Sequence, residues 1–556
     1  MKTRVSLIVL LSCISLLSSC GTSKSLRHKP QLEGYNATAP VVVKESPTVF
    51  TSGNNFLLKN RQNLWELYVE GDPLERGLAT GALTDSLLKN QERIFFSKLK
   101  DLVPSKTKQK LLRGFLKWYN RKLYLNVTEE YKTEIYGISE YTSYDFDYIA
   151  PRYLRNLYLH GAHDIGHALQ DLALVGCSSF AAWGNKSEDG SLILGRNFDF
   201  YVGDEFAKDK IVAFVNPKQG HPFMMVTWAG MIGAVSGMNI EGVTATINAG
   251  KSKIPLIAKT PISLVTREIL QYASNIDEAI AIAKKRKVFV SESIMIGSAK
   301  DKRAIIIEVS PNNFGIYEVP NSNQLICSNH FQSAELKNDK RNVYQIANSH
   351  SQYRYDRMLE LFDENPKINP TVAAAILRNR EGLHDSAIGY GNEKALNQLI
   401  AHHGIIFKPE QRLVWVSSNP YQLGEFVCYD LNEVFKDRKG HPSTVSLQKD
   451  NLDIPKDPFL DTQEYRNYVA YRIADRQMDG YLENKTALPT EFAKNYQSLN
   501  PNYWGVYYKV GVSFYQHKQY QLAQKQFETA LTKEITTIPN KTEIEKYLKK
   551  IKRKLR

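Results

Sequence analysis

The spacing of apolar residues changes clearly close to residue 177. Before it, apolar positions recur every three or four residues in "GLATGALTDSLLKNQERIFFSKLKDLV" (77–103) and "SKTKQKLLRGFLKWYNRKL" (105–123), which predicts helices. After it come short β-branched and aromatic segments broken by Gly, Asn and Pro, such as "SLILGRNFDF" (191–200), "IVAFVN" (211–216) and "GVTATINA" (242–249). The pattern therefore predicts a helical first part followed by a β-rich core.

Helical periodicity returns inside and after this β-rich part. It is clear in "SLVTREILQYASNIDEAIAIAKKR" (263–286) and in two later stretches, 354–362 and 371–379. Strand-like segments occur between and beyond these helices, including "RAIIIEVS" (303–310). Runs of strands with helices outside them favour a layered α+β core over a doubly wound parallel sheet.

These changes of pattern divide the chain into five parts. The polar, Pro-containing stretch after residue 20 is typical of a tether, and the last hundred residues are helical again. We expect a signal peptide at 1–19, a tether at 20–57, a helical pro-segment at 58–176, a catalytic core at 177–450 and a helical C-terminal region at 451–556.

The first twenty residues predict export. Lys2 and Arg4 precede an apolar run, and Leu17-Ser18-Ser19-Cys20 resembles the bacterial lipobox, in which the cysteine is lipidated. An ordinary signal peptide with a chance cysteine is the alternative. The first interpretation makes the protein an exported bacterial lipoprotein, anchored to the membrane through Cys20 and facing the periplasm.

The main feature of the composition is an excess of basic residues. The chain has 556 residues and a formal charge of +14, part of it from "KYLKKIKRKLR" at the C-terminus. No nucleic-acid-binding motif accompanies this charge, so we expect no nucleic-acid partner, and a solvated basic helix end is preferred over attraction to a membrane surface. We expect no cofactor and no metal; His160, His163 and His167 could share one helix face and hold zinc, but helix packing or assistance to self-cleavage is preferred.

The cysteines point to one unusual thiol. Of five cysteines, Cys13 leaves with the signal and Cys20 takes lipid, so Cys177, Cys327 and Cys428 remain. An odd number in an oxidising compartment leaves at least one thiol unpaired within the chain. Cys327 and Cys428 are interpreted as buried core thiols, Cys327 with the alternative of lining a pocket.

A hairpin predicted around "KSEDG" (186–190) gives Cys177 chemically active neighbours. A turn centred near Glu188 pairs residues whose numbers sum to about 376. Cys177 then lies across from Arg196 to Asp199, which brings a guanidinium and a carboxylate to the start of the first strand. A nearby positive charge favours the reactive thiolate.

Four motifs carry a resemblance to a known superfamily. Cys177 opens the first core strand, and "GRNFD" (195–199) follows on the next one; "GMNIEG" (237–242) runs on to Asn248, and "NHF" (329–331) and "SQYRY" (351–355) come later. In this order they resemble the cysteine N-terminal-nucleophile (Ntn) hydrolases, above all the autoproteolytic acyl-coenzyme A:6-aminopenicillanate acyltransferase-like (peptidase C45-type) family, related to choloylglycine hydrolases. The resemblance covers roughly residues 71–430.

The resemblance implies a four-layer αββα sandwich and a self-cleaving enzyme. Scission between Gly176 and Cys177 would free an α-amine, so that Cys177 supplies both nucleophile and base for an acyl-thioester intermediate on an N-acyl amide such as an acyl amino acid, a lipid or a penicillin-like amide. By the same analogy Asn248 and Asn329 would stabilise the oxyanion, Asp199 would hold the amine, and Arg196 would tune the thiolate or position the substrate. The late arginine is assigned to Arg354, with Arg357 as the alternative.

The C-terminal region carries a separate signal. Tyr507, Gly511, Phe514, Ala523, Phe527 and Ala530 have the spacing of one tetratricopeptide-like unit at about 504–537. Because such units usually stack in threes, we expect this one to lean on the preceding domain. The alternative function is a non-catalytic tethered scaffold that binds a protein partner through this unit.

Overall fold

The strands form two sheets that face each other. The computed structural model describes residues 21–36, 38–161, 164, 176–201, 203–251, 257–400, 402–436 and 442–556. Within these ranges the larger sheet has the order β1 (Val43–Ser46), β2 (Val49–Ser52), β3 (Asn55–Lys59), β4 (Trp65–Gly71), β7 (Ile211–Pro217), β8 (Phe223–Thr227), β9 (Ser236–Asn239), β10 (Val243–Ala249), β11 (Glu292–Ser298), β12 (Arg303–Val309) and β13 (Phe314–Tyr317). The smaller sheet has the order β14 (Gln324–Cys327), β5 (Ser178–Ala182), β6 (Ile193–Phe198), β15 (His403–Lys408), β16 (Leu413–Ser417) and β17 (Phe426–Asp430).

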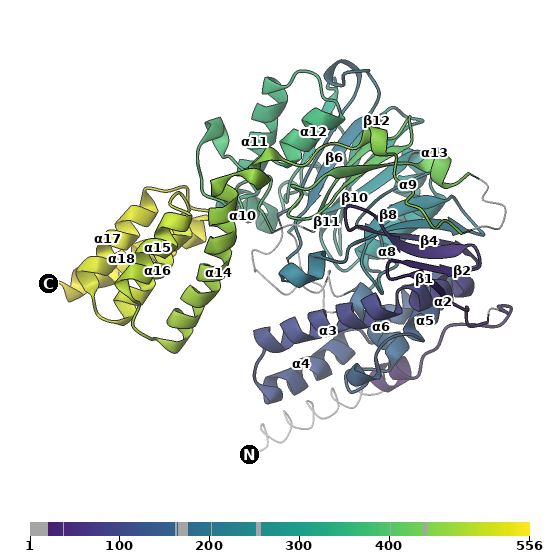
Figure 1. Cartoon of the computed structure of the whole chain (residues 1–556), viewed down its shortest axis with the longest axis horizontal. Coiled ribbons are helices and arrows are strands. Elements are labelled where there is room, and N and C mark those ends of the chain that lie inside the picture. Colours follow the sequence, from purple (N-terminus) through teal and green to yellow (C-terminus); the bar gives the residue numbers. More distant parts are fainter. Residues whose placement is uncertain are drawn as a thin grey trace, which may run out of the picture.

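Helices cover the outer faces of both sheets (Figure 1). The N-terminal helices are α2 (Pro73–Leu83), α3 (Asp85–Leu102), α4 (Lys106–Tyr119), α5 (Glu129–Ser139) and α6 (Arg152–His160). The core contributes α8 (Ile262–Tyr272), α9 (Ile276–Lys285), α10 (Lys340–Asn348), α11 (Ser351–Glu364), α12 (Pro370–Leu377) and α13 (Leu431–Val434). The C-terminal helices are α14 (Gln463–Asn484), α15 (Thr490–Leu499), α16 (Trp504–Gln516), α17 (Tyr520–Leu531) and α18 (Ile538–Lys554).

Three hydrophobic clusters hold the two sheets, the N-terminal helices and the core helices together. One lies between the sheets and joins Phe214 of β7 and Met295 of β11 to Phe407 of β15. A second packs the other face of the larger sheet against the N-terminal helices, α8 and α9, and a third packs the smaller sheet against α11 and α12. The α+β class predicted from the sequence is confirmed. The burial of both sheet faces explains why several strands have continuous apolar runs.

The N-terminal region differs from its prediction. Residues 43–71, expected to be tether and helix, form β1 to β4, and β4 pairs in parallel with β7 from Trp65 opposite Ile211 to Gly71 opposite Pro217. The signal was present in "TVFTSGNNFLLK" (48–59), two apolar runs around a Gly-Asn turn, with Gly53 at a φ of 56°. These strands extend the core sheet, and apolar side chains of β3 and β4 join the clusters on both of its faces.

The C-terminal helices lean on the core, as expected. The Tyr468 hydroxyl of α14 donates a hydrogen bond to the carbonyl of Leu399 over 3.0 Å, and the Asn392 amide donates to the carbonyl of Glu534 over 2.9 Å. Helices α16 and α17 form an antiparallel hairpin in which Phe527 packs against Gly511. The assignment of this hairpin to the tetratricopeptide class stays a prediction.

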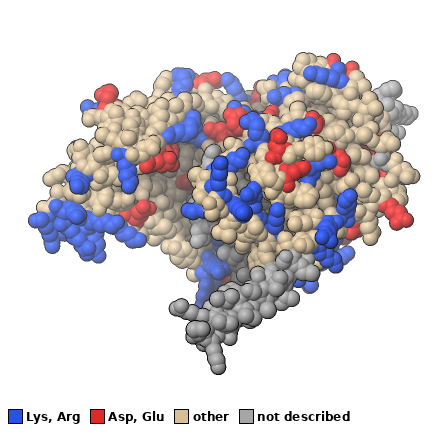
Figure 2. Space-filling view, turned by 90° about the horizontal axis from the view of Figure 1, so that it is seen from below, with Lys and Arg blue, Asp and Glu red and all other residues tan. Residues whose placement is uncertain are grey.

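One group of basic side chains lies at the C-terminal end. Figure 2 shows a dense group of Lys and Arg at the far left, where the C-terminal helices lie, and Lys549, Lys550 and residues 552–554 of α18 are exposed. This agrees with a solvated basic helix end. In the part of the chain that is described, no helix has the length and apolar character needed to span a bilayer. The predicted signal peptide and Cys20 lie outside the described residues.

Candidate active site

Cys177 lies directly before β5, in the hairpin that the sequence predicts. Strands β5 and β6 pair with Ser178 opposite Asn197 and Ser179 opposite Arg196, so paired numbers sum to 375. The predicted register, which places Cys177 across from Arg196–Asp199, is confirmed. The Cys177 side chain is 1% exposed and belongs to the cluster between the larger sheet and the N-terminal helices.

Arg196 is the cation beside the thiol. Its Nη2 donates a hydrogen bond to Cys177 Sγ over 3.7 Å and another to the carbonyl of Ile247, while Nη1 donates to the carbonyl of Val235 over 3.0 Å and to the Ser236 hydroxyl. These hydrogen bonds fix the position of the guanidinium beside the thiol. Burial raises the pKa of the Cys177 thiol, and Arg196 acts against that rise.

Arg354 holds the other side of Cys177. From α11, its Nη1 donates to the carbonyl oxygen of Cys177 over 2.7 Å and to the Ser178 hydroxyl over 2.8 Å, and its Nη2 donates to Asn329 Oδ1 over 2.7 Å. Arg357 instead bonds to Glu360, Asp385 and Asn379, away from Cys177. Of the two arginines considered from the sequence, Arg354 is therefore the one at the candidate site.

Asp199 is buried next to both arginines. Burial raises its pKa to about 7, although Arg354 and Arg196 both act to lower it. Its Oδ1 accepts a long hydrogen bond of 3.5 Å from Gln422 Nε2, and its Oδ2 has no hydrogen-bond partner among the described residues. A buried carboxyl group that is close enough to act on the Cys177 thiol, and that has an acceptor available, can bind a cationic amine.

The two asparagines occupy different environments. Asn248 Nδ2 donates to the carbonyls of Cys327 and Ser328 over 3.2 and 3.4 Å, and its Oδ1 accepts from the Ser179 hydroxyl over 2.8 Å. Within the described residues Asn329 Nδ2 donates one hydrogen bond, to the carbonyl of Ala249 over 2.9 Å. Since an amide NH₂ has two hydrogens, Asn329 keeps one for another acceptor, whereas Asn248 uses its group to join strands β10 and β14.

Gln398 was not found by sequence reasoning. Its Nε2 donates to the carbonyl oxygen of Gly176 over 3.1 Å, on the peptide bond that precedes Cys177. A Cβ on Gly176 would lie 1.8 Å from that same Nε2, so glycine is the residue that allows this approach. Gln398 is 222 positions away in a loop without a motif, and no local pattern could have identified it.

The remaining thiols and the histidine row do not add a second site. Cys327 and Cys428 are fully buried in apolar clusters, and burial raises both pKa values. His160 Nδ1 bonds to the carbonyl of Asn156 and Nε2 accepts from the backbone N–H of Ile232, so both ring nitrogens are used within the protein. His163 and His167 lie outside the described residues, and within those described no group of His, Cys, Asp or Glu could hold a metal.

A match to a family of known proteins falls within the part of the chain that carries the resemblance. Residues 185–419 match the family model described as acyl-coenzyme A:6-aminopenicillanic acid acyl-transferase. This match includes Arg196, Asn248 and Arg354 and begins after Cys177. It supports the Ntn-hydrolase superfamily over this part of the chain.

Two curated relatives match about half of the chain. An uncharacterized protein of Archaeoglobus fulgidus is 25% identical over 272 residues, which is 45% of this chain and 44% of that protein. Protein dcd1B of Dictyostelium discoideum is 22% identical over 296 residues, 50% of this chain and 57% of that protein. The chain therefore spans about half the length of the curated relatives it matches.

Two solved structures are also similar over part of the chain. The Caenorhabditis elegans ortholog of N-acylethanolamine-hydrolyzing acid amidase covers 42% of this chain and 93% of its own, with 16% identity and a TM-score of 0.31. A conjugated bile acid hydrolase from Clostridium perfringens covers 48% of this chain and 94% of its own, with 12% identity and a TM-score of 0.32.

Proposed function

We propose that this protein is a self-cleaving Ntn-type cysteine enzyme that hydrolyses, or transfers, the acyl group of N-acyl amides. One observation carries the proposal: the thiol of Cys177 and the carbonyl of Gly176 each accept a hydrogen bond from a side chain distant in sequence, Arg196 on the sulfur and Gln398 on the oxygen. A buried thiol kept only for packing needs neither. The match to an acyltransferase family over residues 185–419 supports the same class.

Self-cleavage would use the donor on Gly176. Cys177 Sγ attacks the carbonyl carbon of Gly176, the C–N bond breaks as the nitrogen takes the thiol proton, and a thioester forms. Negative charge develops on the Gly176 oxygen during this step, where Gln398 Nε2 can stabilise it. Water then hydrolyses the thioester, which leaves a carboxylate on Gly176 and a free thiol and α-amine on Cys177.

The mature reaction would use the freed amine as base. The amine, with a reference pKa near 8, takes the thiol proton as Sγ attacks the substrate carbonyl, and returns it to the leaving amine. Asp199 would hold this ammonium through its free Oδ2, and Arg354 would fix the Cys177 backbone through its carbonyl. Asn329 has a spare N–H for the oxyanion, so it is assigned that role ahead of Asn248.

Hydrolysis is preferred over transfer for a protein outside the cytoplasm, where coenzyme A is not expected. Export and anchoring through a lipid on Cys20 remain part of this proposal and rest on the lipobox-like sequence alone. The layered αββα arrangement of an Ntn-hydrolase fits the clusters on both faces of each sheet.

Mass spectrometry of the purified protein tests self-cleavage. Wild type is expected as two associated fragments, the larger beginning at Cys177, and Cys177→Ala as a single chain. Cys428→Ala is the matched control, a buried cysteine in the cluster between the smaller sheet and α11 and α12, away from this site, and it should leave cleavage intact. An uncut wild-type chain, identical to Cys177→Ala, would remove the proposed base and with it the mechanism. A panel of N-acyl amides then tests turnover.

A further inference from the structure

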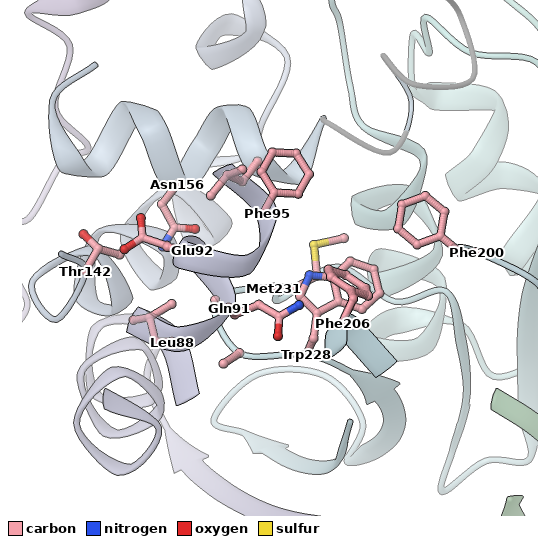
Figure 3. Close-up of a pocket in the computed structure, with 13 residues that line it drawn as sticks. Leu88, Gln91, Glu92, Phe95, Thr142, Asn156, Phe200, Phe206, Trp228 and Met231 are labelled. Carbon is pink, nitrogen blue, oxygen red and sulfur yellow. The ribbon is translucent and has the colours of Figure 1, made fainter. Parts of the chain in front are cut away.

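A pocket lies where the N-terminal helices meet the core (Figure 3). Helices α3 and α6 form one side, and the segment after β6 together with the loop between β8 and β9 forms the other. The empty space measures about 560 Å³, some of it open to solvent. Its lining includes Gln91, Asn156, Phe200, Phe206, Trp228 and Met231. The pocket therefore belongs to both fragments of the proposed cleaved protein.

The core side of the pocket is aromatic and packs against residues of the candidate active site. Phe200 stacks on Trp228 with ring centroids 6.2 Å apart, and Phe200 also stacks on Phe198 at 5.7 Å. The Phe198 ring lies under the Arg196 guanidinium, whose carbon is 4.4 Å from the ring centroid. Since Arg196 also bonds to Cys177 Sγ, a continuous row of contacts joins the pocket wall to the thiol.

The helical side of the pocket holds polar groups that have no protein partner. Asn156 is 1% exposed, and neither its Nδ2 nor its Oδ1 makes a hydrogen bond to the described protein; the same holds for Nε2 of Gln91, which is 6% exposed. Glu92, beside them, is already occupied by Arg155 and by the backbone N–H of Ser143. Buried amides without partners are costly to keep, which indicates that a ligand uses them.

The loop that carries Trp228 and Met231 is held in place. The Thr227 hydroxyl donates to the carbonyl of Met231 over 2.9 Å, and the N–H of Ile232 donates to His160 Nε2 over 3.0 Å. Burial lowers the pKa of His160 to about 4, which keeps its ring neutral and able to accept that bond at neutral pH. A site with fixed walls binds without a large ordering cost.

We infer that this pocket binds the acyl group of the substrate, and that the preferred acyl group is apolar along its length and ends in a neutral hydrogen-bonding group such as a hydroxyl or a primary amide. This deepens the proposed function and rests on it. The apolar part would lie against Phe200 and Trp228. The terminal group would receive a hydrogen bond from Gln91 or Asn156 and donate one to Asn156 Oδ1. A terminal carboxylate is disfavoured, because the Glu92 carboxyl lies on the same wall.

A matched pair of probes tests this inference. The p-nitroanilides of hexanoic acid and of ω-hydroxyhexanoic acid differ only at the end that would reach Gln91 and Asn156. Binding of both is measured by calorimetry to Cys177→Ala, which cannot turn them over, and kcat/KM is measured with wild type. We expect the hydroxylated probe to bind roughly tenfold tighter, the value for one or two net hydrogen bonds.

Two substitutions should remove that preference. Asn156→Leu and Gln91→Leu, each combined with Cys177→Ala, are expected to bring the ratio of the two affinities close to one or reverse it. Asn90→Leu, on the same helix α3 but outside the pocket lining, should leave the ratio unchanged. Asn156→Leu should also raise the melting temperature, because it removes two unpartnered buried polar atoms. If Asn156 had only a structural role, Asn156→Leu would instead lower the melting temperature.

The outcomes separate this inference from the proposed function. Turnover of both anilides without a preference for the hydroxylated one, in wild type and variants alike, would overturn the pocket assignment and leave the proposed enzyme standing. A preference in binding that Asn156→Leu abolishes, without turnover by wild type, would keep the pocket and contradict the enzyme. If Asn90→Leu changed the ratio of the two affinities as much as Asn156→Leu does, the inference would also be overturned.

Discussion

The Arg354 guanidinium donates a hydrogen bond to the carbonyl oxygen of Cys177, 2.7 Å away, across 177 positions of sequence. The same side chain bonds to the Ser178 hydroxyl and to Asn329 Oδ1, so one cation orients the backbone of Cys177 and an amide beside it. Arg354 is fully buried, and burial lowers its pKa to about 10, which leaves it charged at neutral pH.

Replacement of Arg354 should therefore remove activity. We expect Arg354→Leu to reduce amide turnover by about 100-fold or more, because a charge-assisted bond to the nucleophile residue and the orientation of Asn329 are lost together. Initial rates on an N-acyl anilide measure the effect. Arg357→Gln is the matched control, one turn along α11 and bound to Glu360 and Asp385; its rate should stay within about threefold of wild type. If both variants lost the same amount of activity, the cause would be a less stable α11 and not the contact of Arg354 with Cys177.

Gln398 should act on self-cleavage. Gln398→Leu is expected to slow scission at Gly176–Cys177 by about 100-fold, the usual effect of removing one oxyanion donor. A time course of fragment formation after expression, followed by gel and intact mass, measures the rate. Gln411→Leu, a substitution of the same type at a glutamine that bonds to Ser191, is the control. Unchanged scission in Gln398→Leu would mean that the Gly176 oxygen is stabilised by another group.

The fragments should stay associated through a buried ion cluster. Glu134 of α5 accepts bonds from Arg76 over 2.7 Å and from Arg267 of α8 over 3.1 Å, all three side chains being at most 2% exposed. Glu134→Leu leaves two buried guanidiniums without this partner, at a cost of about 3–5 kcal/mol in stability.

Size-exclusion chromatography in mild denaturant measures this association. Wild-type fragments should elute together, and Glu134→Leu fragments should separate at a lower denaturant concentration. Glu129→Gln, in the first turn of the same helix and half exposed, is the control and should behave as wild type. Identical separation of all three proteins would leave the parallel pairing of β4 with β7 as the main attachment.

The stability of the uncleaved protein should depend on pH through Asp199. Its folded pKa of about 7 lies above its ordinary value of 3.8, so the folded state holds the proton more tightly than the unfolded state. The stabilisation from the protonated form is complete below the ordinary pKa and is lost as the pH rises through 7. Asp199→Asn removes this loss.

Melting temperatures in the Cys177→Ala background measure this effect. Relative to its parent, Asp199→Asn should gain stability steadily from about pH 4 to about pH 8. The exposed Asp277→Asn, in the first turn of α9, is the control and should run parallel to the parent. A difference between Asp199→Asn and its parent that does not vary with pH would show that Asp199 is ionised throughout this range.

Local sequence pattern was sufficient to predict many of the secondary-structure elements. The hairpin around Glu188, the alternation of strand and helix after residue 177 and the helical C-terminal region depend on spacing within short windows, where side-chain period and turn residues act directly. The register that brings Arg196 to Cys177 follows from the turn alone, because an antiparallel ladder fixes partners once its turn is placed.

Contacts between distant segments were decided by the tertiary structure. Strands β1 to β4 join the core sheet because β7 offers an open parallel edge, and no local signal states which edge a strand will find. Gln398 reaches Gly176, and Arg354 but not Arg357 reaches Cys177, through packing of loops and helices that only the complete core positions. Motif and spacing by themselves identified Cys177 as the proposed nucleophile and Arg196 as its nearest cation; the close packing of distant elements determined the groups that surround them.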